Sequence, residues 1–132
     1  MHRRLAIGAE VQTEAGAHFR VWAPRRQKVE VVFPAIAQQA ELPSVLLDRE
    51  SDGYFSGFSS EASDGTRYAF RLDDSERLYP DPASRRQPDG PHAPSQIVDP
   101  TRFQWTDREW RGVELKGQVI YELHVGTFTR EG

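Results

Sequence analysis

The 132-residue sequence contains no cysteine. Disulfides and thiolate metal ligands are therefore excluded, and a reducing compartment is permitted. An excess of positive charge is also lacking, because 17 Lys and Arg residues stand against 20 Asp and Glu residues for a formal charge of -3. We therefore expect neither nucleic acid nor an anionic membrane as a partner. No apolar run is long enough for a signal peptide or a membrane span, which makes the cytoplasm the expected location.

Sustained helical periodicity is missing as well, and short segments of alternating polarity take its place. In residues 17–22, Phe19 and Val21 fall on one face, which is the period of a half-buried strand. The segments of this character are 17–22, 28–33, 42–47, 54–58 and 67–72. Strands that recur roughly every ten residues between turns predict an all-β, antiparallel sandwich around a single core.

Proline dominates residues 79–100, which hold six prolines and Gly90. Proline breaks a helix and cannot donate to a sheet ladder, so we expect ordered coil rather than helix or sheet. Tyr79, Ile97 and Val98 give this stretch apolar anchors that a free linker would lack. A connector of this length in a compact protein is normally either functional or flexible.

The last residues, 117–132, contain a β-branched and aromatic run at 119–125, long enough for a buried strand, which Gly126 ends. An unpaired apolar strand exposes backbone donors and acceptors, so it must be covered, disordered or paired with another chain. We expect weak self-association or fraying there. The predicted division is a sandwich over 1–78, a proline-rich connector over 79–116 that packs toward a further domain, and an isolated strand over 117–132.

Several motifs resemble the α-amylase superfamily, glycoside hydrolase family 13. The motifs V-W-A-P at 21–24, D-G-Y-F at 52–55 and G-T-R-Y-A-F-R-L-D at 65–73 resemble its amino-terminal sandwich. That sandwich is an immunoglobulin-like, early-set fold of the carbohydrate-binding module family 48 type. The segment Y-E-L-H-V-G-T-F-T at 121–129 resembles the first strand of the superfamily's (β/α)8 barrel. The connector at 79–100 is more specific and resembles that of the malto-oligosyltrehalose trehalohydrolases.

The resemblance implies a parent enzyme that hydrolyses the α-1,4 bond next to the terminal trehalosyl unit of maltooligosyltrehalose and releases trehalose. Such hydrolysis needs two carboxyl groups beside the scissile bond, and the family places them at the ends of later barrel strands. Because a complete barrel takes roughly 250 residues, we assign no catalytic, cofactor-binding or metal-binding residue in this chain. We expect it to be inactive alone, to use no cofactor, and to have the (β/α)8 catalytic domain of the same chain as its partner.

Four residues are candidates for contacts to glycan or to a neighbouring domain. Trp105 and Trp110 could stack on sugar rings, but their position just ahead of the barrel strand favours burial at a domain junction. Glu122 and His124 lie two apart on one face of the expected strand, a spacing that also suits an acid/base pair or half of a metal site. The resemblance instead implies that these two residues form polar lining inside the barrel.

Other aromatic and basic residues have plainer interpretations. Trp22 continues the strand that holds Phe19 and Val21, which favours a structural role for its indole. Arg20, Arg67 and Arg71 alternate with apolar residues, and this pattern favours a solvated sheet surface over an oligosaccharide groove.

Three hypotheses remain open from the sequence. The first is the amino-terminal module of a trehalohydrolase, which packs on the barrel and helps to shape its cleft; a branching or debranching enzyme is the alternative parent. The second is a module that binds maltooligosaccharide independently of any barrel. The third is a self-contained interaction domain in which residues 119–125 pair within the sandwich or with another copy.

Overall fold

The computed structural model describes residues 3–12, 16–36, 39 and 41–131. Strands form nearly all of the regular structure, and the chain divides into two units, Met1–Arg102 and Phe103–Gly132. The predicted all-β antiparallel fold is confirmed. No helix in the described ranges is long and apolar enough to cross a membrane.

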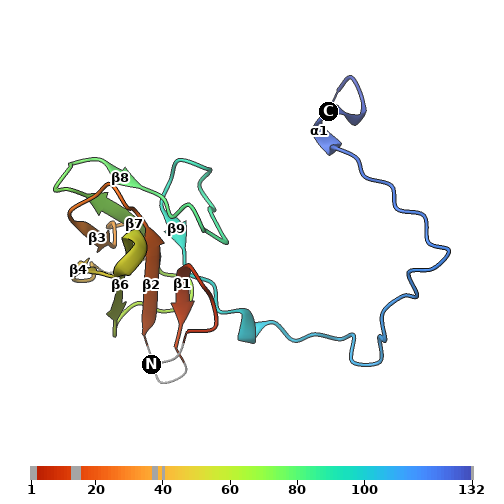
Figure 1. Cartoon of the computed structure of the whole chain (residues 1–132), viewed down its shortest axis with the longest axis horizontal. Helices are drawn as coiled ribbons and strands as arrows, with labels where there is room; N and C mark the ends of the chain where they lie inside the picture. The colour runs from red at the N-terminus through yellow and green to blue at the C-terminus, as the bar shows by residue number, and fades with distance from the viewer. Residues whose placement is uncertain (1–2, 13–15, 37–38, 40, 132) are drawn as a thin grey trace. The chain divides into compact units, whose positions relative to one another are not determined.

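The first unit is a sandwich of two antiparallel sheets (Figure 1). The first sheet has the order β1-β2-β6-β5, formed by Gly8–Val11, Ala17–Trp22, Tyr54–Ser59 and Asp48–Arg49. The second sheet has the order β4-β3-β7-β8, with β9 also paired to β7. Its strands are Val45–Leu46 (β4), Val29–Val32 (β3), Arg67–Leu72 (β7), Leu78–Tyr79 (β8) and Ser95–Gln96 (β9). Single 3-10 turns occupy Ser51–Gly53 and Pro100–Arg102.

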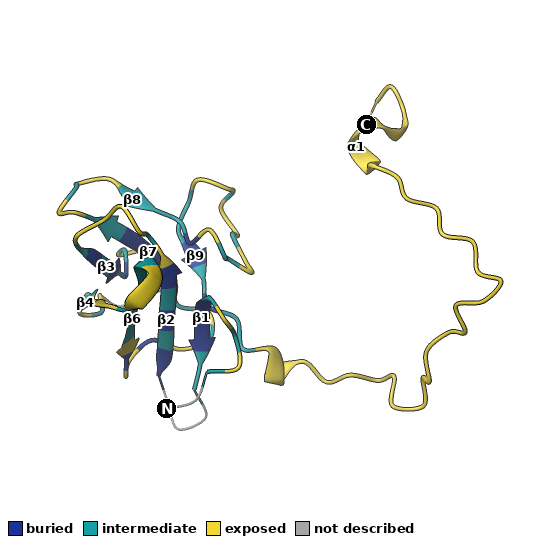
Figure 2. Cartoon of the chain, viewed as in Figure 1, coloured by how far each residue is buried: buried dark blue, intermediate teal, exposed yellow. Residues whose placement is uncertain are grey.

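Aromatic rings join the two sheets at the centre of the core. Phe19 on β2 meets Tyr68 on β7 edge-on, with ring centroids 5.1 Å apart, and meets Phe33 at 5.9 Å. Figure 2 shows buried residues concentrated along β2, β3 and β7. Burying each Phe side chain contributes about 1.5–3 kcal/mol, so these rings provide a large part of the force that holds the sheets together.

The strand predictions are confirmed in full at 17–22 and 67–72, where alternation is strong. Those at 28–33 and 54–58 correspond to β3 and β6 with small shifts at their ends. The segment 42–47 contains only the two-residue β4. The strands β1 and β5 were not predicted, because a short edge strand such as Asp48–Arg49 carries no apolar alternation.

The first part of the connector belongs to the sandwich. Both β8 and β9 pair with β7, so the expectation of coil throughout 79–100 is wrong at these two short strands. Proline permits them because Pro80 and Pro94 lie just outside the paired residues. The boundary placed after residue 78 falls inside β8, and the compact unit continues to Arg102.

The second unit is exposed throughout its described residues, 103–131 (Figure 2). Its regular element there is the short helix α1, Val125–Phe128. The strand expected at 119–125 does not form: Val119 and Ile120 are 92% and 81% exposed. In the described part of the chain no neighbouring strand supplies hydrogen bonds to this backbone, and a strand requires such a partner.

Candidate functional site

The four residues proposed from the sequence all lie in the second unit. Trp105 and Trp110 are 69% and 67% exposed, and Trp105 packs edge-on against Phe103 with centroids 4.8 Å apart. His124 precedes α1, where its Nδ1 lies 3.2 Å from the hydroxyl of Thr127. Because 119–124 is not a strand, the structure does not place Glu122 and His124 on one strand face. The burial of the two tryptophans at a domain junction stays a prediction.

The outward face of the first sheet carries paired aromatic and charged side chains. The guanidinium of Arg20 lies 3.7 Å from the centroid of the Tyr54 ring. It also donates from Nη2 to Oε2 of Glu50 at 2.7 Å and from Nε to Oε1 at 3.1 Å. These side-chain hydrogen bonds raise the pKa of Arg20 and lower the pKa of Glu50. Arg20 is thus half-buried and paired, rather than simply solvated.

The three arginines considered together in the sequence do not share a face. Arg20 lies on β2 of the first sheet, whereas Arg67 and Arg71 lie on β7 of the second. Each has its own carboxylate partner: Arg67 donates to Asp89 at 2.7 Å, and Arg71 donates to Glu30 at 2.8 Å. The three side chains therefore do not form one basic groove.

A hollow of about 300 Å³ lies at the end of β2, lined by Trp22, Ala23, Pro24, Arg25 and Arg26. Trp22 is 57% exposed, and its indole Nε1–H donates to the carbonyl oxygen of Asp52 at 3.0 Å. The structural role expected for Trp22 accounts for this hydrogen bond but leaves the exposed ring face without a function.

The turn beside Trp22 is held from both sides. On one side, the N–H of Ala23 donates to the carbonyl oxygen of Gly53 at 2.9 Å. On the other side, Oδ1 of Asp73 accepts the N–H groups of Gln27 and Lys28 at 2.8 and 3.0 Å. The bonds from Lys28 and then Gln27 lower the pKa of Asp73, which therefore stays ionised and keeps both bonds.

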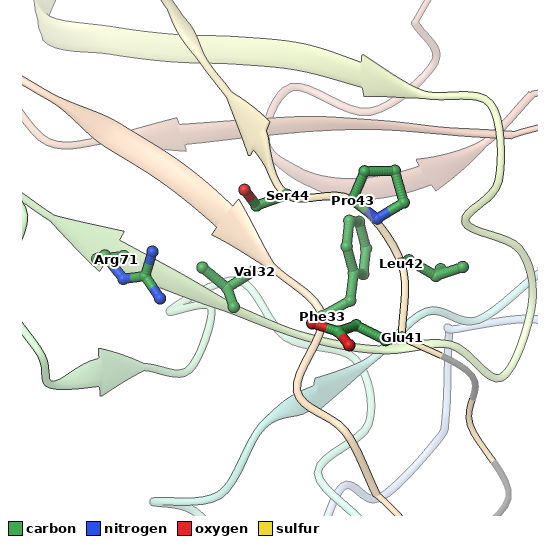
Figure 3. Close-up of a pocket in the computed structure, with 7 residues that line it drawn as sticks. All are labelled: Val32, Phe33, Glu41, Leu42, Pro43, Ser44 and Arg71. Carbon is green, nitrogen blue, oxygen red and sulfur yellow. The ribbon is translucent and has the colours of Figure 1, made fainter.

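A second hollow, of about 450 Å³, lies beside the end of β3 (Figure 3), lined by Val32, Phe33, Glu41, Leu42, Pro43, Ser44 and Arg71. At its edge Glu30 accepts hydrogen bonds from Arg71 Nη1 at 2.8 Å and from Ser44 Oγ at 2.5 Å. Apolar side chains next to charged ones suit a ligand that has both hydroxyl groups and an apolar face.

A buried polar cluster fixes the connector against β7. The phenol of Tyr68 donates to Oδ2 of Asp81 at 2.7 Å, and Ser95 Oγ accepts the backbone N–H of Asp81 at 2.9 Å. Burial raises the pKa of Asp81, while hydrogen bonds from Tyr68 and the N–H of Ala83 act in the opposite direction. Burial and the nearby Asp81 raise the pKa of Tyr68, so the phenol remains a donor.

A second polar cluster anchors the start of the chain on the first sheet. Arg3 Nη1 lies 2.6 Å from Nδ1 of His18, and because arginine only donates, this imidazole nitrogen accepts. Burial, and then the charge of Arg3, lower the pKa of His18. Burial acts to raise the pKa of Glu10, but N–H donors from Arg4 and Leu5 outweigh it and lower that pKa. The side chains of this cluster therefore serve to hold the start of the chain on the sheet. Within the described ranges, no three His, Cys, Asp or Glu residues are grouped to hold a metal ion.

Comparison with models of protein families shows to which family the chain belongs. The model of the family described as carbohydrate-binding module 48, the isoamylase N-terminal domain, matches residues 6–86, which is more than half of the 132 residues. The chain belongs to the carbohydrate-binding module 48 family. The matched residues begin just before β1 and include the strands from β1 to β8 together with Asp81, so the family domain corresponds to most of the first unit.

The relatives of this chain are much longer proteins, and the match covers about a fifth of each. It is 38% identical over 120 residues to a malto-oligosyltrehalose trehalohydrolase of Rhizobium sp. strain M-11, covering 90% of this chain and 20% of the relative. It is 40% identical over 121 residues to that of Saccharolobus solfataricus, with the same two shares. A 1,4-α-glucan branching enzyme of Rhizobium etli is 32% identical over 136 residues, covering 96% and 18%. The chain therefore spans about a fifth of the length of the curated relatives it matches.

A solved structure is also similar to this chain in fold and in sequence. A crystal structure from Salmonella typhimurium, assigned by its name to the α-amylases, superposes with a TM-score of 0.77 and 34% identity, over 95% of this chain and 20% of that one. The resemblance to the trehalohydrolases and the immunoglobulin-like sandwich predicted from the motifs are thus confirmed.

Sequence reasoning missed two features of the module 48 sandwich. The first is the exposed ring of Trp22 beside Arg25 and Arg26, although a tryptophan followed at once by Ala-Pro was a signal that its strand ends there. The second is the buried Asp81, whose partners Tyr68 and Ser95 are 13 and 14 residues away. A pair at such separation leaves no periodic signal in a single sequence.

Proposed function

We propose that this chain is the amino-terminal, non-catalytic module of a malto-oligosyltrehalose trehalohydrolase. The observation that carries the proposal is the identity to trehalohydrolases of two distant organisms over nine-tenths of the chain. The parent enzyme would hydrolyse the α-1,4 bond next to the terminal trehalosyl unit of maltooligosyltrehalose and release trehalose. The proposal includes a cytoplasmic location and a role in the synthesis of trehalose from glucan.

The role proposed for the module is to pack on a (β/α)8 catalytic domain of the same chain. The second unit supports this proposal, because the side chains of Ile120, Tyr121 and Leu123 are exposed in a run of high β-propensity. Such a run would gain hydrogen bonds and burial when strands of a barrel lie on both sides of it. Trp105 and Trp110 would then be covered at the junction between sandwich and barrel.

No residue of the chain is proposed to act directly on the scissile bond. Hydrolysis of a glycosidic bond needs one carboxylic acid as proton donor and a second carboxylate as nucleophile or base. The exposed Glu122 and His124 would line the barrel, and the chemistry would belong to carboxylates of the catalytic domain.

The test is the product formed by the protein that the continuing reading frame encodes. Incubated with maltooligosyltrehalose, this longer protein is expected to release free trehalose, detected by chromatography, while the 132-residue chain at the same concentration releases none. Failure of the longer protein to release trehalose from this substrate contradicts the proposal.

A second candidate parent is a 1,4-α-glucan branching enzyme, which the 32% identity to the Rhizobium etli protein favours. The same longer protein distinguishes the two. A branching enzyme would convert linear amylose into a product with α-1,6 linkages, visible as a new anomeric proton resonance, and would leave maltooligosyltrehalose without free trehalose.

A further inference from the structure

We propose that the hollow beside Trp22 is a binding site for an α-glucan chain. The inference rests on the proposed function for the class of ligand, and it adds where the module holds that ligand and with which side chains. The site consists of the exposed indole face of Trp22 and the guanidinium groups of Arg25 and Arg26.

Trp22 provides a stacking surface whose orientation is already fixed. Its Nε1–H is occupied by the carbonyl oxygen of Asp52 at 3.0 Å, yet 57% of the residue remains exposed. The polar edge of the ring therefore faces the protein while an apolar face remains in water. The C–H face of a pyranose ring matches such a surface in size and polarity.

Arg25 and Arg26 provide hydrogen-bond donors next to that surface. Among the residues that the structure describes, Arg25 has neither a hydrogen-bond nor an ion-pair partner, and Arg26 makes only a 3.4 Å contact from Nη1 to Oδ2 of Asp73 with its side chain. A guanidinium carries five N–H donors in a planar fork, which can reach neighbouring hydroxyl oxygens of one sugar ring. An indole face combined with free donors favours a neutral sugar over a simple anion.

The turn that carries these groups is rigid before any ligand arrives. Asp73 holds the N–H groups of Gln27 and Lys28, and Gly53 packs so closely on Pro24 that an added Cβ would lie 2.5 Å from the Pro24 Cβ. Because the backbone of the turn needs little further ordering on binding, the entropic cost falls mainly on the two arginine side chains.

The hollow is also remote from the place where the chain leaves the sandwich. Trp22 is the last residue of β2, whereas Ala17, the first, pairs with Ser59 ahead of the loop that carries Asp64. Asp64 accepts the N–H of Asp99 at 2.8 Å and the guanidinium of Arg102 at 2.5 Å. A strand of this length separates its two ends by about 20 Å, so Trp22 lies far from the end of β2 that leads toward this loop.

The test titrates the full 132-residue chain with maltoheptaose and follows indole and amide resonances by NMR. We expect a saturable shift of the Trp22 indole N–H and of the amides of residues 22–27. Trp22→Ala should weaken binding about tenfold and Arg25→Ala about threefold to fivefold. Tyr121→Ala and Arg111→Ala replace an exposed aromatic residue and an exposed arginine in the second unit and should leave the affinity within about twofold.

The Arg25→Ala variant should fold like the parent chain, because an exposed side chain without a partner contributes little to stability. Weaker binding by this variant therefore cannot be ascribed to misfolding. The proposal is overturned if maltoheptaose causes no saturable shift, if the shifts instead map to the hollow at Val32 and Ser44, or if both variants bind as the parent chain does. It is equally overturned if inorganic phosphate produces the same shifts and maltoheptaose does not. None of these results bears on whether the longer protein releases trehalose, so the two proposals fail separately.

Discussion

The phenol of Tyr68 lies 2.7 Å from the carboxylate of Asp81, with both residues 2% exposed. Tyr68 belongs to the central strand β7, whereas Asp81 lies in the proline-rich segment that follows β8. The contact therefore ties that segment to the core of the sandwich. Together with the pairing of β9 to β7 and the bonds from Asp99 and Arg102 to Asp64, it explains why the compact unit continues beyond the last long strand to Arg102.

Removal of the Tyr68 hydroxyl should destabilise the sandwich. In Tyr68→Phe the buried carboxylate of Asp81 loses its side-chain donor, and we expect the free energy of unfolding to fall by about 1–3 kcal/mol. Urea denaturation followed by circular dichroism measures the change. Tyr121→Phe, at a residue that is 74% exposed, is the matched control and should alter the value by less than about 0.5 kcal/mol. Equal stability of the two variants would show that the contact does not hold the segment.

The pH dependence of stability should reveal the buried carboxyl. Burial raises the pKa of Asp81 in the folded protein above its ordinary value of 3.8, so the folded state binds this proton more tightly than the unfolded chain does. The stability that this tighter proton binding contributes to the folded protein is complete below about pH 3.8. It is lost as the pH rises through the folded pKa of Asp81. Asp81→Asn cannot titrate, so the stability of the parent chain relative to this variant should fall from about pH 4 to about pH 7. Urea midpoints at both pH values measure this, and a constant or rising difference would contradict it.

Gly53 should tolerate a side chain less well than Gly90 does. Both have positive φ, at +81° and +97°, but an added Cβ at Gly53 meets Pro24 whereas none of the neighbouring atoms lies within 4 Å at Gly90. The cost of the left-handed backbone is common to Gly53→Ala and Gly90→Ala, and overpacking adds about 1–3 kcal/mol for Gly53→Ala alone. Urea unfolding of the two variants gives this difference, and the Trp22 indole resonance should move only in Gly53→Ala. Equal losses would mean that the turn beside Trp22 is not tightly held.

Strong alternation of apolar and polar residues made most of the strands of the sandwich predictable from the sequence. Phe19 and Val21 in β2, and Tyr68 and Phe70 in β7, report burial through their spacing, and the central strands were located from that signal alone. The exposed ring of Trp22 was not predictable in this way, because exposure at a strand end depends on what the following turn covers. The strand expected at 119–125 has the right composition, but composition cannot supply the neighbouring strands that a buried strand needs.

The exposed run at 119–125 should make the isolated chain associate weakly. Ile120→Lys places a charge in this run and should lower the weight-average sedimentation coefficient at high concentration, because a charge opposes apolar association and strand pairing. Gln118→Lys adds the same charge just ahead of the run and should have little effect. Amide exchange at 119–124 should be close to that of an unfolded chain at low concentration. Strong protection of these amides would instead indicate that the run pairs within the chain.

The most direct test of the account is an assay of the purified 132-residue chain with maltooligosyltrehalose, alongside the longer protein from the same reading frame. The account predicts free trehalose from the longer protein and none from the short chain, because the carboxylates that cleave the glycosidic bond belong to the catalytic domain. Release of trehalose by the short chain alone, at a rate proportional to its concentration, would contradict the central claim that it is a non-catalytic module.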